Sequence, residues 1–368
     1  MSAWYTITNV NELDSPALVF FPERMKENIR LLKEMAPDTS RLRPHVKTNK
    51  CAEVCRMMLD AGIYKFKCAT IAEGEMLGMI NAPDVLLAYQ PTGPRAQRFL
   101  ALVTKYPNTK FACLVDNLST ATALSAEAVK NNKEVAVFID INSGMNRTGI
   151  TPKDALPLYL QIKNLKGITV KGLHAYDGHL RDTDLAARTQ RCDEAFALVE
   201  KLHHDIQLQT GDNLTIVAGG TPTFQIHSKR KDVESSPGTF IFTDKSNQQS
   251  IADQPFIFAA LVVARIASKP APDIITVDLG HKAIASENPL ANRVTFLNAE
   301  GLEPIGHSEE HLVLKAPLNN THQVGDVLYG VPYHICPTVA LYETAAVIQN
   351  GAITDNWSII SRKRKISV

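Results

Sequence analysis

Short apolar runs alternate with amphipathic stretches over most of this chain, and that alternation limits its fold more than any other feature. From Arg43 to about Asp244, each run rich in β-branched or aromatic residues is followed by a stretch with helical periodicity. The runs lie at 42–48, 65–70, 84–89, 110–116, 134–140, 170–176, 214–220 and 239–244. Eight strands alternating with helices predict a closed parallel (β/α)8 barrel of the TIM type, with a doubly wound sheet as the alternative.

The helices between the runs are expected at 72–80, 94–106, 152–165 and 184–205, most of them opening with Pro, Asp or Ser/Thr in the capping position. After about residue 250 the pattern changes to short alternating runs, one of them at 338–349, separated by Gly, Pro and Asn turns. The sequence therefore predicts a barrel over 20–250 and a second, mostly β domain over 251–368. About 1–19 is expected to belong to this second domain. The run PALVFF (16–21) fits either unit.

Composition excludes several classes of function. The 368 residues carry 39 Lys and Arg against 38 Asp and Glu, a net charge of +1, which gives no general attraction to nucleic acid or an anionic membrane. The basic run Arg362–Lys365 is interpreted as a solvated tail. The N-terminal residues show no secretory signal, and the longest apolar run, Phe256–Ser268, is too short to span a bilayer. Six scattered cysteines indicate free thiols, so we expect a cytoplasmic protein without a membrane or nucleic-acid partner.

Lys47 ends the first predicted strand. Catalytic residues of parallel barrels lie at the carboxyl ends of strands, where a lysine can lose its proton near neutral pH. A lysine at the barrel rim with no chemical role is the alternative, and position alone does not separate the two. Turns rich in glycine, VAGGTPT (217–223) and SSPGTF (235–240), flank the last predicted strands, where such barrels often bind phosphate. A phosphate site with a lysine able to form a Schiff base is the minimum requirement for pyridoxal phosphate.

Other candidate residues follow the fifth and sixth strands. Arg147 can hold the cofactor's phenolate oxygen, while His174, Tyr176 and His179 can stack on or bond to its ring. His334 and Cys336 stand at i, i+2, so on a strand both side chains face one side. An imidazole with a thiolate suits zinc better than magnesium or calcium, although such a pair is more often structural.

These motifs resemble the D-threonine aldolase and D-serine dehydratase family, the metal-activated relatives of alanine racemase. The resemblance rests on RPHVKTNK, IDINSGMNRTG, HAYDGH, VAGGTPT, ESSPGTFIFTD, VDLGHKAIASE, HSEEH and VPYHICPT, in that order from about residue 14 to about 345. It implies an alanine racemase-like (fold type III) pyridoxal phosphate enzyme that acts as a homodimer.

The resemblance also implies roles for single residues. Lys47 is the Schiff-base lysine, Arg147 bonds the phenolate oxygen, and Tyr176 lies near the ring nitrogen. The phosphate is held by Gly219, Gly220, Thr221, Gly238 and Thr239, and His334 and Cys336 bind the metal, zinc or alternatively manganese. Two positions depart from the family pattern. Asn49 stands where a histidine is usual, and Ser236 stands where alanine racemases carry an arginine, which counts against simple racemisation.

A metal beside the substrate's β-hydroxyl has two uses. It can favour loss of the hydroxyl proton, which breaks Cα–Cβ and yields glycine and an aldehyde, or it can make the hydroxyl a better leaving group. The first is an aldolase of D-3-hydroxy amino acids such as D-threonine, with His179 as candidate base, and this is the reaction we expect. D-serine dehydratase, giving pyruvate and ammonia, is the alternative: the His-x-Cys pair resembles the dehydratase pattern, whereas HAYDGH resembles that of the aldolases. An amino acid racemase, or a barrel that binds the cofactor without turnover, is less consistent with the metal motif and the second domain.

Overall fold

The computed structural model describes residues 3–368, and the contacts of this chain divide it into two compact units. The barrel unit comprises Leu32–Lys47, Ala52–Gly238 and Lys363–Val368. The β unit comprises the described part of Met1–Leu31, together with Thr48–Cys51 and Thr239–Arg362.

The barrel unit is built on a parallel sheet of seven strands that lie in chain order, β2 to β8. They are β2 (Lys65–Cys68), β3 (Asp84–Leu87), β4 (Lys110–Val115), β5 (Val135–Asp140), β6 (Ile168–Ala175), β7 (Thr215–Ala218) and β8 (Val233–Ser235). The segment before Lys47 joins the two edge strands: the Arg43 N–H donates to Ser235 O over 2.9 Å, and the Val46 N–H donates to Lys67 O over 2.9 Å. This segment is not a regular strand, but its isolated bridges, Leu42 to Ser235 and His45 to Lys67, take the place of the first predicted strand and close the sheet into the predicted TIM-type barrel.

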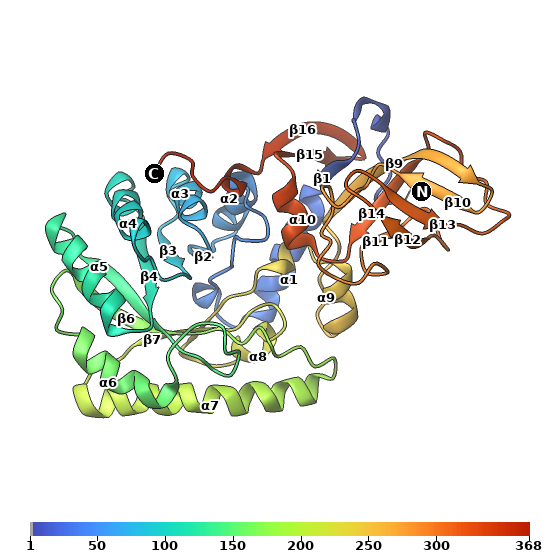
Figure 1. The fold of residues 1–368 in the computed structure, drawn as a ribbon. Helices are drawn as coiled ribbons and strands as arrows, with labels where there is room; N and C mark the ends of the chain where they lie inside the picture. The colour runs from blue at the N-terminus through green and yellow to red at the C-terminus, as the bar shows by residue number, and fades with distance from the viewer. Residues whose placement is uncertain (1–2) are drawn as a thin grey trace. The chain divides into compact units, whose positions relative to one another are not determined.

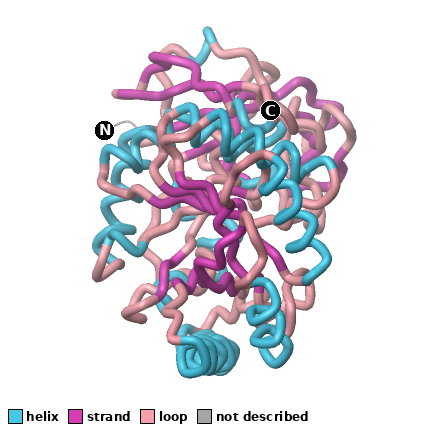
Figure 2. Tube along the Cα trace, turned by 90° about the vertical axis from the view of Figure 1, so that its left-hand side faces the viewer, coloured by secondary structure: helices cyan, strands magenta, loops and turns pink. Residues whose placement is uncertain are grey.

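Helices surround these strands, and Figure 2 shows the strands at the centre of the barrel unit with helices outside them. They are α2 (Ala52–Asp60), α3 (Ile71–Met79), α4 (Pro94–Lys105), α5 (Leu118–Lys130), α6 (Pro152–Ile162), α7 (Leu185–Thr210) and α8 (Phe224–His227), with a 3-10 turn, η2 (Thr39–Arg41). The four predicted helices correspond to α3, α4, α6 and α7. The capping signals act as expected, since Pro94 and Pro152 open their helices and the Asp184 carboxylate accepts from the Ala187 N–H.

The predicted eighth strand at 239–244 is wrong. That segment forms the 3-10 turn η3 (Thr239–Ile241). The last strand of the barrel is β8, which begins six residues before the predicted strand does. The Thr243 N–H donates to Thr239 O over 2.7 Å and Thr243 has a φ of 44°, so the backbone turns instead of extending. The three apolar side chains Phe240–Phe242 are all buried, which explains why the run resembled a buried strand.

The barrel interior changes from apolar to polar toward the carboxyl ends of the strands. Leu86, Ala112, Leu114, Phe138 and Val217 form an apolar cluster. Asp140 follows Phe138 by two residues, so its carboxylate lies on the same face of β5. In the sheet, Asp140 pairs with His174 on β6. The strands therefore present ionisable side chains at the end of the barrel where chemistry is expected.

The β unit contains a sheet of nine strands, labelled in Figure 1. They are β1 (Ala17–Phe20), β9 (Ala260–Ala271), β10 (Ile274–Val277), β11 (Val294–Phe296), β12 (Glu303–His307), β13 (Leu312–Lys315), β14 (Val327–Pro332), β15 (Thr344–Gln349) and β16 (Ala352–Ser358). The main path runs β12-β13-β10-β9-β1-β15-β16, with β14 on β9 and β11 on β14. The run PALVFF thus belongs to this unit, because β1 pairs with β9 and β15.

The remaining helices lie outside the two sheets. They are α1 (Pro22–Met35), α9 (Lys245–Ser250) and α10 (Ile335–Leu341), with the 3-10 turns η1 (Val10–Glu12) and η4 (Ile360–Arg362). The run 338–349, interpreted from sequence as one alternating strand, begins inside α10, and only its second half is β15. No helix within residues 3–368 combines the length and apolarity that a bilayer crossing requires. All six cysteines are free thiols.

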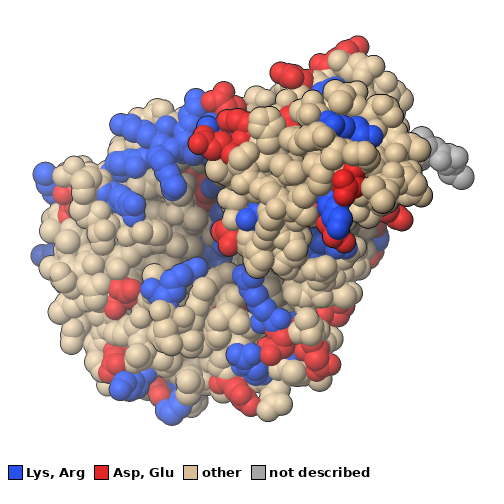
Figure 3. All heavy atoms as spheres, turned by 45° about the vertical axis from the view of Figure 1, so that its right-hand side comes forward, with Lys and Arg blue, Asp and Glu red and all other residues tan. Residues whose placement is uncertain are grey.

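The basic run near the C-terminus is not a free tail. Lys363–Val368 belongs to the barrel unit, where the Glu75 carboxylate on α3 accepts from the N–H groups of Ser367, over 3.0 Å, and Val368, over 3.2 Å. Lys363, Arg364 and Lys365 are nonetheless exposed. Figure 3 shows Lys and Arg side chains gathered on part of the face drawn.

Candidate active site

A cavity of about 650 Å³ lies in the barrel unit, lined by residues from the carboxyl ends of several strands. Its ionisable lining is Lys47, Lys67, His45, Tyr89, Asp116, Asp140, Arg147, His174, Tyr176 and Arg364. A volume of this size suits a small ligand with a cofactor. The cavity therefore occupies the position that barrel enzymes use for catalysis.

Three residues singled out from the sequence meet around one aromatic ring. Lys47 Nζ lies 5.6 Å from the centroid of the Tyr176 ring, and Arg147 Cζ lies 4.9 Å from it. Lys47 is half-buried and Arg147 is exposed. A Cβ at Gly178 would lie 2.3 Å from Tyr176 Oη, so glycine at 178 is what lets this tyrosine fold back over its own loop.

A second lysine, Lys67 on β2, shares the cavity. Its side chain is fully buried, and Nζ lies 3.5 Å from His174 Nε2, whose Nδ1 lies 2.7 Å from Asp140 Oδ1. Burial and the neighbouring charge of Lys47 lower the pKa of Lys67 to about 7, although Asp177 and Asp140 partly oppose them. Burial also lowers the pKa of His174. Burial alone would raise the pKa of Asp140, but bonding to His174 leaves it below its ordinary value.

The glycine-rich turns lie together at the ends of β7 and β8. Gly219 has a φ of 75°, and a Cβ there would lie 2.6 Å from His227 Cδ2, so this turn requires glycine. A Cβ at Gly220 would lie 3.0 Å from the Tyr176 ring, which brings the turn next to the cavity's tyrosine. The Gly238 N–H donates to Thr221 Oγ1 over 3.0 Å and joins the two turns.

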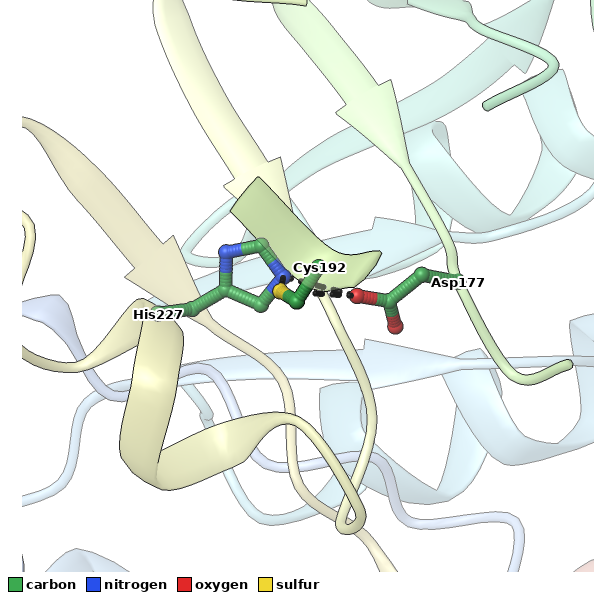
Figure 4. A group of neighbouring side chains, drawn as sticks. All are labelled: Asp177, Cys192 and His227. Carbon is green, nitrogen blue, oxygen red and sulfur yellow. Dashed lines mark hydrogen bonds and ion pairs between the residues drawn. The ribbon is translucent and has the colours of Figure 1, made fainter. Parts of the chain in front are cut away.

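Asp177 holds the glycine turn after β7 in place through hydrogen bonds. Its carboxylate accepts from the Thr223 hydroxyl over 2.8 Å and lies 2.7 Å from His227 Nε2 (Figure 4). Burial alone would raise the pKa of Asp177, but His227 and Thr223 hold it below its ordinary value. Thr223 Oγ1 in turn accepts the Gly220 N–H over 3.3 Å. The bonding fixes the glycine turn from the loop after β6.

Asp177, Cys192 and His227 have donor atoms within 4.8 Å of one another, which is compatible with a metal ion. The hydrogen bonds favour a different interpretation. Arg230 NH1 donates to His227 Nδ1 over 2.8 Å, so Nε2 carries the ring proton and directs it at Asp177. Burial raises the pKa of Cys192 to about 12, which keeps its thiol protonated. We therefore interpret the cluster as a brace.

The residues fit pyridoxal phosphate. The cofactor's aldehyde, ring and phosphate require a lysine at the end of the first strand, an arginine and a tyrosine beside it, and a glycine turn such as the one at Gly219 and Gly220, where a side chain would meet His227 or Tyr176. Thr221 is buried, and its hydroxyl already accepts from Gly238.

The predicted metal ligands lie in the β unit. His334 is the N-cap of α10 and Cys336 lies in its first turn, so the strand geometry assumed from sequence is wrong. The two side chains still interact: burial alone would lower the pKa of His334, but hydrogen bonding with Cys336 and Glu287 raises it to about 9. Within the same unit, Thr48 Oγ1 lies 3.1 Å and Thr239 Oγ1 3.8 Å from Cys336 Sγ.

The remaining sequence candidates lie apart from these groups. His179 packs against the Gly144 turn and is not among the described residues that line the cavity, and its buried Nδ1 has no partner there. Asn49 is buried and accepts the Cys51 N–H over 3.1 Å, a role within its own segment. Ser236 donates its hydroxyl to Arg43 O over 2.8 Å and brings no charge to the barrel.

Sequence reasoning missed Lys67, the Asp140–His174 pair and the Asp177 brace. Lys67 had a visible signal, because a lysine between Phe66 and Cys68 in a parallel strand is buried on either face. The contacts of Asp177 with Thr223 and His227 join residues about fifty positions apart, and no local pattern announces them.

Comparisons with known proteins agree with this geometry. Residues 22–245 match the family described as "Alanine racemase, N-terminal domain", and residues 259–348 match the "Putative serine dehydratase domain". The chain is 27% identical to a D-threonine aldolase from Arthrobacter sp over 95% of this chain and 93% of that protein. It is 24% identical to a 3-hydroxy-D-aspartate aldolase from Paracoccus denitrificans over 96% of this chain and 93% of that protein.

Among solved structures, the D-threonine aldolase from Filomicrobium marinum superimposes with a TM-score of 0.87 at 23% identity, covering 98% of this chain and 99% of that one. This likeness confirms the fold, and the sequence comparisons confirm the resemblance to the aldolase and dehydratase relatives of alanine racemase. The match to the alanine racemase N-terminal domain, at 22–245, covers more than half of the residues of this chain. This chain therefore belongs to the alanine racemase N-terminal domain family.

Proposed function

We propose that this protein is a lyase that uses pyridoxal phosphate and a divalent metal to cleave D-3-hydroxy amino acids to glycine and an aldehyde. The observation that carries the proposal is the placement of Lys47, at the end of the first barrel strand, in one cavity with Tyr176 and Arg147. The names of similar proteins support the substrate class: two are aldolases, of D-threonine and of 3-hydroxy-D-aspartate, and one from Delftia sp. is a D-threo-3-hydroxyaspartate dehydratase.

Each cavity residue has a task in this proposal. The Lys47 amine binds the cofactor covalently, and Arg147 holds its phenolate oxygen. Tyr176 positions the ring, while Gly219, Gly220, Thr221, Gly238 and Thr239 hold the phosphate. When bound, pyridoxal phosphate supplies the electron sink for charge that develops at Cα.

His334 and Cys336 hold the metal, for which zinc is the first choice and manganese the second. The metal, when bound, acts as a Lewis acid on the substrate's hydroxyl oxygen. His179 is the candidate base for that hydroxyl proton, because its buried Nδ1 has no partner among the described residues. Ser236, neutral and bonded to Arg43 O, disfavours racemisation.

Dehydration of D-serine to pyruvate and ammonia is the second candidate, favoured by the His334 and Cys336 pair that the resemblance associates with dehydratases. We further propose that the protein is cytoplasmic and that it forms a homodimer. Light scattering on the purified protein checks the dimer directly.

A product assay tests the reaction. The protein is supplied with pyridoxal phosphate and zinc or manganese, given D-threonine or D-serine separately, and its products are resolved by mass spectrometry. Glycine with acetaldehyde from D-threonine supports the aldolase. Pyruvate from D-serine, or 2-oxobutyrate from D-threonine, supports the dehydratase instead.

A further inference from the structure

Lys67 points into the barrel interior beside the cofactor lysine. It lies on β2 one residue before Cys68, its residue pairs with Leu86 of the apolar interior cluster, and its side chain is 1% exposed. Its Nζ lies 5.4 Å from the centroid of the Tyr176 ring, on which Lys47 also converges at 5.6 Å. A buried amine is rarely retained in a barrel interior without a task, because taking its charge out of water is costly.

Two neighbours fix where this amine lies. His174 Nδ1 donates to Asp140 Oδ1 over 2.7 Å, because a carboxylate can only accept. The other ring nitrogen, Nε2, therefore carries a lone pair, and it faces Lys67 Nζ over 3.5 Å. The row Asp140, His174, Lys67 holds the lysine at the cavity wall in either of its protonation states.

The charges around Lys67 are mixed and come from several elements. The charged and titratable groups that interact with it or share its cavity are Arg43, His45, Lys47, Tyr89, Asp116, Asp140, Arg147, His174, Tyr176, Asp177 and Arg364. Burial is the largest influence, and together with Lys47 it lowers the pKa of Lys67 to about 7. The amine therefore gains and loses a proton within the working range of an enzyme.

We propose that Lys67 is a second proton-transfer residue of this site. His174 holds it in place, and Lys67 stores a proton during turnover of the substrate. The proposal rests on the proposed function. In the retro-aldol reaction a proton leaves the β-hydroxyl, the Cα–Cβ bond breaks, and a proton must arrive at Cα. The neutral amine of Lys67 receives the β-hydroxyl proton from the base that removes it and becomes an ammonium; it then gives a proton to Cα and is an amine again, so charge and atoms balance without another reactant.

The first test uses cofactor-free protein and is independent of catalysis. Between about pH 7 and pH 10.5, Lys67 is protonated in the unfolded chain but neutral in the folded one. Rising pH therefore stabilises the wild type through this group, and the penalty is fully present below pH 7. Lys67→Met removes the group, so its melting temperature relative to wild type rises by several degrees as pH falls across that window.

Lys110→Met is the control, because Lys110 is an exposed lysine at the first residue of a neighbouring barrel strand, β4. Its difference from wild type stays constant over the window. A constant difference for Lys67→Met as well would overturn the proposal, since Lys67 would then titrate as an ordinary lysine.

The second test uses the loaded enzyme. Lys67→Met and Lys67→Arg both lower kcat by roughly 10²-fold, because neither side chain can accept and release a proton near neutral pH. Both also lose the rise of kcat through pH 7, while Lys110→Met retains it. An unchanged pH profile in both Lys67 variants overturns the proposal. If the wild type has no lyase activity yet the cofactor-free titration behaves as expected, the proposed function fails and the ionisation of Lys67 is supported.

Discussion

His227 Nε2 donates its proton to Asp177 across 2.7 Å, and Arg230, bonded to the opposite ring nitrogen over 2.8 Å, fixes that tautomer. Because Asp177 also accepts from the Thr223 hydroxyl, one buried carboxylate joins the loop after β6 to the start of α8. The glycine turn proposed to hold the phosphate lies between them. Cofactor binding is therefore expected to depend on a residue that never touches the cofactor.

Asp177→Ala leaves the hydrogen-bond donors of His227 and Thr223 buried without an acceptor. We expect the free energy of unfolding to fall by about 3 kcal/mol and affinity for pyridoxal phosphate to fall roughly tenfold or more. Denaturant unfolding and cofactor titration measure these. Asp205→Ala is the control, because Asp205 lies on α7 in an ion pair with Lys201. Unchanged cofactor affinity in Asp177→Ala would show that the turn holds without the brace.

Glu75 anchors the C-terminal segment through both carboxylate oxygens. Burial alone would raise the pKa of Glu75, but bonding to Ser367 and Val368 lowers it to about 2. Its folded value is depressed, so its contribution to stability is present above about pH 4.5 and lost as pH falls toward 2. Glu75→Gln places an amide donor against these N–H groups, and we expect faster trypsin cleavage at Arg362–Lys365.

Mass spectrometry of timed digests measures that cleavage. Glu53→Gln is the control, because Glu53 lies on α2 with a third of its side chain exposed, and this variant should be digested like the wild type. Equal cleavage in Glu75→Gln and wild type would mean that Glu75 does not anchor the segment.

Two cysteine variants distinguish the candidate metal sites. If His334 and Cys336 bind the ion, Cys336→Ala lowers bound zinc to near zero, whereas Cys192→Ala leaves it unchanged. Metal content after dialysis, measured by plasma mass spectrometry, decides between them. Loss of zinc from Cys192→Ala with retention in Cys336→Ala would transfer the metal to the Asp177 cluster.

The barrel was predictable because parallel strands buried on both faces give continuous apolar runs. The same rule failed at 239–244: Phe240–Phe242 are buried in a turn, and burial without periodicity does not separate a turn from a strand. It also failed at 338–349, where the first half of an apolar run folds as α10. Of the eight predicted barrel strands, six correspond to β2–β7, the first is a segment with isolated bridges, and the eighth lies at 233–235 instead of 239–244.

For the site, residues next to strand ends could be named from sequence, because barrel topology brings those ends together. Lys47, Arg147 and Tyr176 share one cavity for that reason. The supporting contacts could not be named. Asp177 and His227 lie on opposite sides of α7 in the sequence, so only the packed fold brings them together. Lys67 was overlooked because its strand was interpreted by its apolar neighbours alone.

The most direct test of the central claim is to identify the lysine that carries the cofactor. The protein is incubated with pyridoxal phosphate, reduced with borohydride and digested, and the peptides are mapped by tandem mass spectrometry. The account predicts the pyridoxyl group on Lys47, with Lys67 unmodified. A pyridoxyl group on Lys67, or on neither lysine, would contradict it.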